Sequence, residues 1–199
     1  GCHQSNSGGA YDGFLAKFNS SGTRLWGTFY GGSGWDYVHF CAVDADGNVC
    51  ITGNTGSKNN ISSTGAFQTD LSGPYYNGDG LIAKFNSLGV RQWATYYGDW
   101  GEDRALNCTF DVGGNVYVAG LTTANGGAPT GGLATAGAHQ TEYGGGVYDG
   151  YLLKLTPSGS RAWCSYFGGN GNEDGNYCAA DPSGNIYLLG CTSSTNAIS

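Results

Sequence analysis

The residue types best suited to chemistry are two pairs of adjacent carboxylates, Glu102 with Asp103 and Glu173 with Asp174. Glycoside-cleaving enzymes use two carboxyl groups, one as an acid and the other as a base or nucleophile. Both pairs lie in glycine-rich links before an expected strand, where solvent-exposed loop side chains are the simpler explanation. A hydrolase or lyase acting on polysaccharide is therefore the enzymatic alternative, and the sequence does not favour it.

Alternating acidic residues in the run Asp44-Ala-Asp-Gly-Asn48 are typical of a calcium-binding loop. The equivalent runs that start at Asp111 and Asp181 lack the second aspartate, and no distal glutamate of the EF-hand type is present. An Asp followed three residues later by Gly is also typical of a hairpin turn. The pattern predicts three tight turns and no metal site.

The three histidines complete no catalytic set that spacing can identify. His3 and His139 occupy the position that Phe67 holds in a third copy of the same segment, which predicts a packed ring at each place. His39 lies in an expected strand. We expect no catalytic residue, no metal and no cofactor.

Seven cysteines are many for a cytosolic chain of this length and ordinary for a secreted one. Cys41 and Cys50 are centred near a predicted hairpin turn, and Cys164 and Cys178 are centred on a glycine-rich link. If each pair is directly opposed on antiparallel strands, the separation suits a disulfide. The alternative is that Cys41, Cys108 and Cys178 are small buried residues of one repeated position.

These candidates recur because the chain contains three copies of one unit. The segment Asp12-Gly-Phe-Leu-Ala-Lys-Phe18 returns at residues 79–85 and 149–155, always after a Gly-x-x-Gln segment. The positions with a repeated structural role are Asp12, Asp79 and Asp149, then Trp26, Trp93 and Trp163, then Asp44, Asp111 and Asp181. We place the unit boundaries at 1–64, 65–136 and 137–199. Because Met is absent, we expect a processed chain or a piece of a longer one.

Each unit is predicted to contain four short strands, which in the first unit are residues 12–18, 24–30, 37–43 and 49–53. The fourth strands at 116–120 and 186–190 are apolar on both faces, which predicts a sheet with neighbours on both sides. Four-stranded antiparallel units of this size are typical of β-propeller blades, whereas β-solenoid rungs are shorter and lack hairpin turns. The expected fold is all-β, with three four-stranded blades of an incomplete ring.

The composition excludes several other classes. The chain has 38 glycines, 12% charged residues, 14% aromatic residues and a net charge of −7. Helical bundles are rich in Ala, Glu, Lys and Leu, and disordered chains are poor in aromatic residues. The chain has no basic patch for nucleic acid and no apolar run long enough to span a membrane as a helix.

Four segments of the second unit together resemble a known repeat. These are Gly65-Ala-Phe-Gln-Thr69, Asp79-Gly-Leu-Ile-Ala-Lys84, Trp93-Ala-Thr-Tyr-Tyr-Gly98 and Asp111-x-x-Gly-Asn-Val-Tyr-Val-Ala-Gly120. They resemble the SBBP repeat, the seven-bladed β-propeller repeat of large bacterial secreted and cell-surface proteins. The resemblance implies a propeller fold and an extracellular role, with no catalytic residues. Closed propellers have about four to eight blades, so further blades of the same polypeptide or neighbouring copies must complete the ring.

The function we expect is a non-enzymatic structural or binding scaffold of a secreted or cell-surface protein, with surface proteins or glycans as further partners. The alternative within this class is a subunit of a self-assembling filament whose open blade faces are covered by neighbouring chains. Loops on rigid scaffolds commonly carry binding sites, which directs attention to the links at 54–78 and 121–148. The first interface candidates are the aromatic residues Phe67, Tyr75, Tyr76 and Tyr143.

Overall fold

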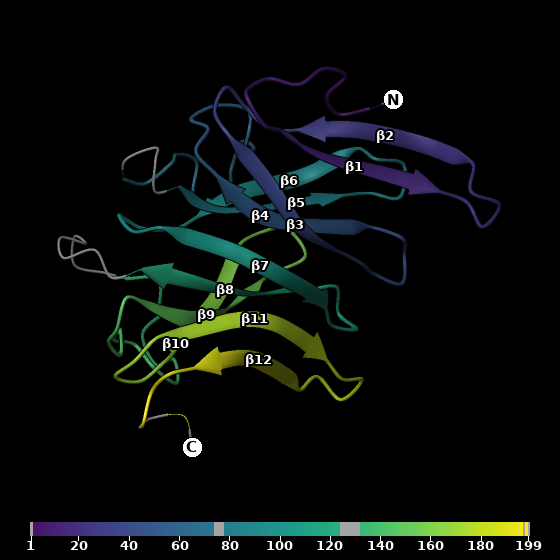
Figure 1. Cartoon of the computed structure of the whole chain (residues 1–199). Helices are drawn as coiled ribbons and strands as arrows, with labels where there is room; N and C mark the ends of the chain where they lie inside the picture. The colour runs from purple at the N-terminus through teal and green to yellow at the C-terminus, as the bar shows by residue number, and fades with distance from the viewer. Residues whose placement is uncertain (1, 74–77, 124–131, 197, 199) are drawn as a thin grey trace.

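The computed structural model describes residues 2–73, 78–123, 132–196 and 198 (Figure 1). Within these residues the protein is all-β and contains no helix, so no described helix could cross a membrane. The strands are β1 (Gly13–Phe18), β2 (Arg24–Tyr30), β3 (Asp36–Val43), β4 (Val49–Thr55), β5 (Asp79–Phe85), β6 (Arg91–Tyr97), β7 (Asp103–Phe110), β8 (Val116–Thr123), β9 (Tyr148–Leu155), β10 (Arg161–Phe167), β11 (Glu173–Ala180) and β12 (Ile186–Thr192). All four strands expected in each unit are therefore present.

The strands end where the sequence supplies residues for turns. In the turn between β1 and β2, Gly22 has a φ of +79°, a left-handed conformation that glycine adopts without steric cost. The Asp-x-x-Gly-Asn turn between β3 and β4 likewise places Gly47 at a φ of +77°. Its Asp44 accepts hydrogen bonds from the backbone N–H groups of Asp46 and Asn48, at 3.0 and 2.8 Å. The predicted hairpin turns are confirmed.

The hydrogen-bonded sheets do not coincide with the sequence units. The two four-stranded antiparallel sheets have the orders β3-β4-β5-β6 and β7-β8-β9-β10, and β1-β2 and β11-β12 form two-stranded sheets. The boundaries 1–64, 65–136 and 137–199 were expected to enclose one four-stranded unit each, and that expectation is wrong. Each complete sheet joins the last two strands of one unit to the first two of the next, because the fourth strand bonds a neighbour on both edges.

The junction between successive units has the same register in both complete sheets. In the first, Val49 pairs with Phe85 and Cys50 pairs with Lys84. The same offset continues along β8 and β9, where Val116 opposes Leu155. Antiparallel register fixes which side chains share a face, so the two junctions bury equivalent residues.

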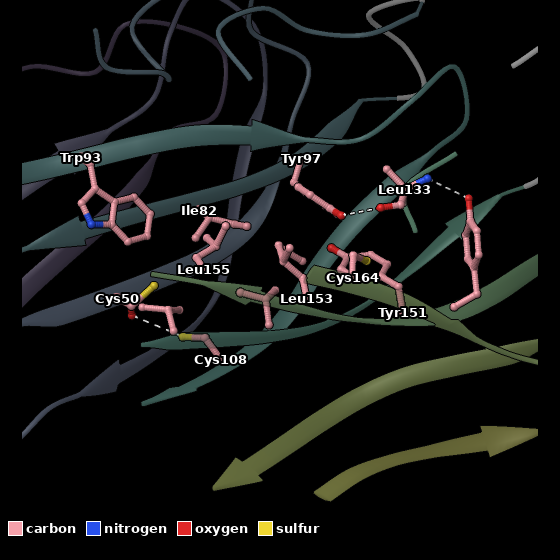
Figure 2. Close-up of a cluster of buried hydrophobic side chains, with 14 residues drawn as sticks. Cys50, Ile82, Trp93, Tyr97, Cys108, Leu133, Tyr151, Leu153, Leu155 and Cys164 are labelled. Carbon is pink, nitrogen blue, oxygen red and sulfur yellow. Dashed lines mark hydrogen bonds between the residues drawn. The ribbon is translucent and has the colours of Figure 1, made fainter. Parts of the chain in front are cut away.

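The buried residues fill the spaces between successive sheets. The third strands β3, β7 and β11 neighbour one another in space, so that β7 contacts both of the others. One hydrophobic cluster lies between the two complete sheets and includes Ile82, Trp93, Tyr97 and Leu153 (Figure 2). Within it the Tyr97 hydroxyl donates to the Leu133 carbonyl at 3.0 Å, which satisfies the polar end of a fully buried ring.

The two-stranded sheets lie at opposite ends of the described fold, β1-β2 near the N-terminus and β11-β12 near the C-terminus (Figure 1). Their apolar residues are exposed where the equivalent residues of the interior are not. Phe14 is 74% exposed and Leu189 is 65% exposed, whereas Leu81 and Ala119 at the equivalent positions are fully buried. Each of these two-stranded sheets therefore leaves part of its apolar surface uncovered within the described residues.

Candidate functional site

Two carboxyl groups meet in each unit, but they are not the adjacent pairs that the sequence suggested. One lies at the start of the first strand of the unit and the other begins the third strand, 24 residues later in all three cases. In the second unit a Cβ atom at Gly98 would lie 2.9 Å from Asp79 Oδ1 and 2.7 Å from Asp103 Oδ2. Both carboxyl groups therefore face the same small space, which only a glycine leaves open. The three pairs are Asp12 with Asp36, Asp79 with Asp103, and Asp149 with Glu173.

The adjacent carboxylates considered in the enzymatic alternative, Glu102 with Asp103 and Glu173 with Asp174, do not face one another. Adjacent residues of a strand point to opposite faces of the sheet, so the two carboxyl groups separate. Asp103 and Glu173 are buried, at 0% and 3% exposure, whereas Glu102 is half-exposed and accepts a hydrogen bond from Arg104 Nε at 2.7 Å. The buried members are not solvated loop residues either, because they sit at the first residue of a strand.

A glutamine holds the first carboxyl group of the pair in place. Gln68 Nε2 donates to Asp79 Oδ2 at 2.6 Å, and its Oε1 accepts from the Gly98 backbone N–H at 3.0 Å. Gln4 does the same in the first unit, donating to Asp12 at 3.1 Å. This is the role of the repeated Gly-x-x-Gln segment: it ties the segment ahead of the first strand to the end of the second strand.

The ring inside that segment packs as the sequence predicted. The ring centroids of His3 and Tyr30 are 5.7 Å apart, and those of Phe67 and Tyr97 are 5.9 Å apart. His139 stacks on Phe167 at 6.3 Å. The three residues therefore act as packing rings at one repeated position, and burial lowers the pKa of His3.

The second carboxyl group is held by donors from the link before the third strand, from the end of the fourth strand and from the loop that follows it. Asp36 accepts from Gly32 N at 2.8 Å and from Ser57 Oγ at 2.7 Å, and Thr55 Oγ1 donates to its other oxygen. Glu173 has the equivalent donors in the third unit, with Gly169 N at 2.8 Å. These bonds tie the start of the third strand to the end of the fourth.

The middle pair lacks part of this hydrogen bonding. The Oδ1 atoms of Asp79 and Asp103 are buried without a hydrogen-bond partner, as is Oδ1 of Asp149. Burial raises the pKa of Asp79 to about 7 and that of Asp149 to about 6, and it holds the pKa of Asp103 well above its usual range. Because two like charges cannot both ionise cheaply in one buried space, the middle pair retains a proton near neutral pH.

The chemistry open to these pairs is limited by their burial. A proton-donating carboxyl group with a raised pKa could serve as a general acid only if a substrate reached it. Asp79, Asp103 and Asp149 are all fully buried. Within the described residues the pairs therefore connect strands rather than face a substrate.

The carboxylate oxygens of the Asp-x-x-Gly-Asn turns accept hydrogen bonds from within the same turn. In the second unit Asp111 Oδ1 accepts from the N–H groups of Gly113 and Asn115, and Asn115 Nδ2 donates to Oδ2 at 2.8 Å. The third unit repeats these bonds around Asp181. The described residues hold no cluster of three or more His, Cys, Asp or Glu side chains that could bind a metal ion.

Neither expected disulfide is present, and all seven cysteines are free. In the first hairpin Cys41 pairs with Ile51 and Cys50 pairs with Ala42, because the five-residue turn shifts the register by one. Cys41 is consequently exposed while Cys50 is buried. Cys164 lies in β10 and Cys178 in β11, which belong to different sheets. Burial raises the pKa of both thiols to about 12, so they remain protonated.

The aromatic interface candidates divide into two groups. Phe67 is 40% exposed, but Arg161 lies over its ring at 4.5 Å, so it joins two successive units. Tyr143 packs against the hydrophobic cluster of Figure 2, with its ring 6.1 Å from that of Tyr166. Tyr75 and Tyr76 lie outside the described residues.

The tryptophan of each unit is the centre of a second repeated arrangement, at the junction with the next unit. Trp26 Nε1 donates to the Ser87 carbonyl at 3.2 Å, and Trp93 Nε1 donates to the Pro157 carbonyl at 2.9 Å. Both acceptors belong to the turn between the first and second strands of the following unit. A glycine of that turn lies against the ring: a Cβ at Gly159 would be 2.6 Å from Trp93.

No described turn covers Trp163, the tryptophan of the third unit. It lines a cleft of about 570 Å³ together with Leu152, Leu188 and Tyr166. The sequence identified the tryptophan position but not its partner, because the partner lies about 60 residues further along the chain. The open cleft is thus the position that a following turn occupies at the two internal junctions.

No protein-family model matches the sequence, and no curated protein matches it.

Proposed function

We propose that this chain is a non-enzymatic scaffold segment of a secreted or cell-surface protein, built from β-propeller blades of the SBBP type. The observation that carries the proposal is that the repeated polar groups are used inside the fold. Asp36, Gln68 and Asp111 each accept or donate hydrogen bonds that join strands or close turns. A catalytic group is needed once, whereas these groups recur in every unit, as groups that maintain a scaffold do.

The proposed blade arrangement rests on how the sheets pack. Antiparallel four-stranded sheets that pack face to face about an axis bring their innermost strands together. The third strands β3, β7 and β11 are the first strands of three successive sheets, and they are neighbours in space. This packing supports a radial arrangement over a straight stack, and the resemblance to SBBP repeats supports it independently.

The proposed surroundings follow from the resemblance and from the uncovered ends. An SBBP-type chain lies outside the cell, where surface proteins or glycans are available as ligands for the links at 54–78 and 121–148. Further blades, from the same polypeptide or from neighbouring copies, would cover the exposed residues Phe14 and Leu189. Free thiols replace the expected disulfides, so cysteine pairing does not contribute to the assignment of compartment.

The blade arrangement can be tested by distances between spin labels at equivalent positions. Phe40 on β3 and Tyr177 on β11 are exposed near the inner edge of sheets two apart. Leu25 on β2 and Ala162 on β10 are exposed on outer strands, also two sheets apart. Each pair is replaced by cysteines in a chain whose exposed Cys2, Cys41 and Cys191 are changed to Ser.

A radial arrangement gives a longer distance for the outer pair than for the inner pair, because the sheets diverge from the axis. A straight stack gives equal distances, about 20 Å for two sheet spacings, and would contradict the propeller. Mixing doubly labelled with excess unlabelled chain restricts the measurement to distances within one molecule.

A further inference from the structure

The two ends of the described fold are complementary halves of one sheet. At each internal junction the fourth strand of a unit pairs with the first strand of the next, as β4 pairs with β5 and β8 with β9. Strand β12 lacks such a partner in the described chain, and so does β1. The internal register carries over residue by residue: Ile51 opposes Ala83 and Val118 opposes Leu153, so Leu188 would oppose Ala16.

The apolar surface exposed at each end matches surface that is buried at the internal junctions. Phe18 is 58% exposed, and its equivalents Phe85 and Leu155 are fully buried. On the other end Tyr187 is 61% exposed, whereas the equivalent Tyr117 is 4% exposed. Residues of this size are buried wherever the chain supplies the next half-sheet.

The ends also carry the two halves of the tryptophan arrangement. Trp163 lines an open cleft, whereas Trp93 is covered by the turn that contains Gly159. The equivalent turn of the first unit contains Gly22, and no described atom lies within 4 Å of the position a Cβ would take there. The Ser20 carbonyl stands at the position from which Pro157 accepts the Trp93 N–H.

Charge is complementary across the ends as well. Lys84 Nζ lies 3.8 Å from Asp44 of the preceding unit, and Lys154 Nζ lies 3.9 Å from Asp111. Lys17 stands at the equivalent position of the first unit. Asp181 stands at the other end, half-buried in a turn whose hydrogen bonds come from within the turn itself.

We propose that two copies of this chain join head to tail, so that β1 of each copy pairs with β12 of the other. Each junction forms a sheet in the order β11-β12-β1-β2, with the first-unit turn over Trp163 and Lys17 beside Asp181. Two copies then contribute four complete sheets and two composite sheets, a ring of six. Six lies within the range of about four to eight blades that close into propellers. This inference rests on the proposed blade arrangement, and it names the partner as a second copy.

Multi-angle light scattering of the full chain tests the proposal. We expect a mass of twice 20.6 kDa. The variant Leu189→Asp should dissociate the pair, with affinity reduced more than about 100-fold, because the junction would bury an unpaired carboxylate. Leu189 is exposed within one copy, so the isolated fold should tolerate the change. The matched control is Val112→Asp, which introduces the same charge at an 86% exposed turn residue away from both ends.

Cross-linking tests the register. With the exposed Cys2, Cys41 and Cys191 changed to Ser, Ala16→Cys combined with Leu188→Cys should give a disulfide-linked product under mild oxidation, because directly opposed residues have Cα atoms about 4.5–5.5 Å apart. Moving the second cysteine one residue, to Leu189→Cys, directs it to the other face of the sheet and should abolish the product.

A chain that is monomeric at its highest soluble concentration would overturn the proposal, and so would an open polymer. A dimer that survives Leu189→Asp, or that cross-links equally with both cysteine placements, would overturn it too. The scaffold proposal is judged separately by the spin-label distances. A monomer with diverging sheets would keep the blade arrangement and reject the second copy, whereas equal distances would reject the blades themselves.

Discussion

The carboxyl pairs of the first and second units occupy the same place in the fold but differ in hydrogen bonding. Asp12 accepts from the N–H groups of Gly8 and Gly9, at 2.7 and 3.1 Å, and Asp36 accepts from Ser57 and two further donors. In the second unit Asp79 and Asp103 each keep one buried oxygen without a partner. Position alone therefore does not determine whether a buried acid stabilises the fold.

The sequence supplies one reason for the difference. Ser57 donates to Oδ2 of Asp36, and the residue at that position in the sequence of the second unit is Ala124, which has no hydroxyl group, so Oδ2 of Asp103 has one donor fewer among the described residues. The third unit has Ser194 there, and the backbone N–H of Ser194 donates to Glu173 Oε1 at 3.3 Å. Burial raises the pKa of both Asp36 and Asp103, and at Asp103 the nearby carboxylate of Asp99 raises it further.

The largest expected effect comes from removing the acid that has the most donors. Asp36→Ala should lower the free energy of unfolding by about 3–5 kcal/mol, because it strands several buried donors without an acceptor. Asp103→Ala should cost less, since it strands the N–H of Asp99, 2.9 Å away, and the hydroxyl of Thr122 but no third donor equivalent to Ser57. Urea unfolding of both variants measures the difference. Equal losses would mean that hydrogen-bond number does not distinguish the two pairs.

The dependence of stability on pH should expose the middle pair. The pKa of Asp79 rises on folding to about 7 and that of Asp149 to about 6, so the folded chain binds more protons than the unfolded chain above about pH 4. Stability should therefore fall by about 4 kcal/mol as the pH rises from about 5 to 8. Urea unfolding at a series of pH values measures it, and a rising profile would contradict the raised pKa values.

At still lower pH the direction reverses. Hydrogen bonds from Asn185 and its neighbours lower the pKa of Asp181, and hydrogen bonds outweigh the effect of burial on Asp111 and Glu173, whose pKa values are also lowered. These groups stabilise the fold while they are ionised, and their contribution is lost as the pH falls through their folded pKa values. The stability maximum should lie in the mildly acidic range between these two effects.

Asp79→Asn converts the middle pair into a neutral and charged pair. The amide oxygen can still accept from Gln68 Nε2 and from Ser72 N, which lie 2.6 and 2.8 Å from Oδ2. The amide nitrogen takes the place of the unpartnered Oδ1 beside Asp103. We expect the free energy of unfolding to rise by about 1–2 kcal/mol at about pH 8 and to vary less with pH, because the repulsion between two buried carboxylates is removed.

The matched control is Asp12→Asn, in the pair with complete hydrogen bonding. Here both oxygens accept from backbone N–H groups, and an amide nitrogen would face Gly8 or Gly9 instead. We expect the free energy of unfolding to fall by about 1 kcal/mol. The comparison fails if the two substitutions change stability in the same direction.

The local structure could be predicted from the sequence, but much of its assembly could not. The positions of the strands along the chain and the turn at Asp44 and Gly47 follow from the types of residues close together in the sequence. The carboxyl pairs were missed although the 24-residue spacing repeats in all three units, because adjacency drew attention to Glu102 and Asp103. A spacing that recurs in every unit indicates which side chains meet better than adjacency in the chain does, since adjacent side chains on a strand point to opposite faces.

The sheet composition and the cysteine register depended on contacts that no short window contains. The fourth strand of one unit meets the first strand of the next across a long link, so the repeat boundary at residue 64 gave no sign that the sheet continues. The predicted pairing of Cys41 with Cys50 was wrong by one residue in register. A shift of one residue places a side chain on the other face of the sheet. In a repeat protein, a misplaced unit boundary or a one-residue error in register therefore changes the predicted structure more than an error in the type of one element.

The smallest effect should come from Glu102→Gln, next to the buried Asp103. Glu102 is half-exposed, and its bond to Arg104 is a surface ion pair that water screens. We expect a change of less than about 0.5 kcal/mol in urea unfolding, and no change in the pH profile. Arg104→Gln is the partner control, because loss of the same ion pair from the other side should give the same small value. A loss comparable to that of Asp103→Ala would mean that the two neighbours act as one site. A carboxylate-dependent hydrolase requires such an arrangement, whereas the alternation of side chains along a strand places Glu102 and Asp103 on opposite faces.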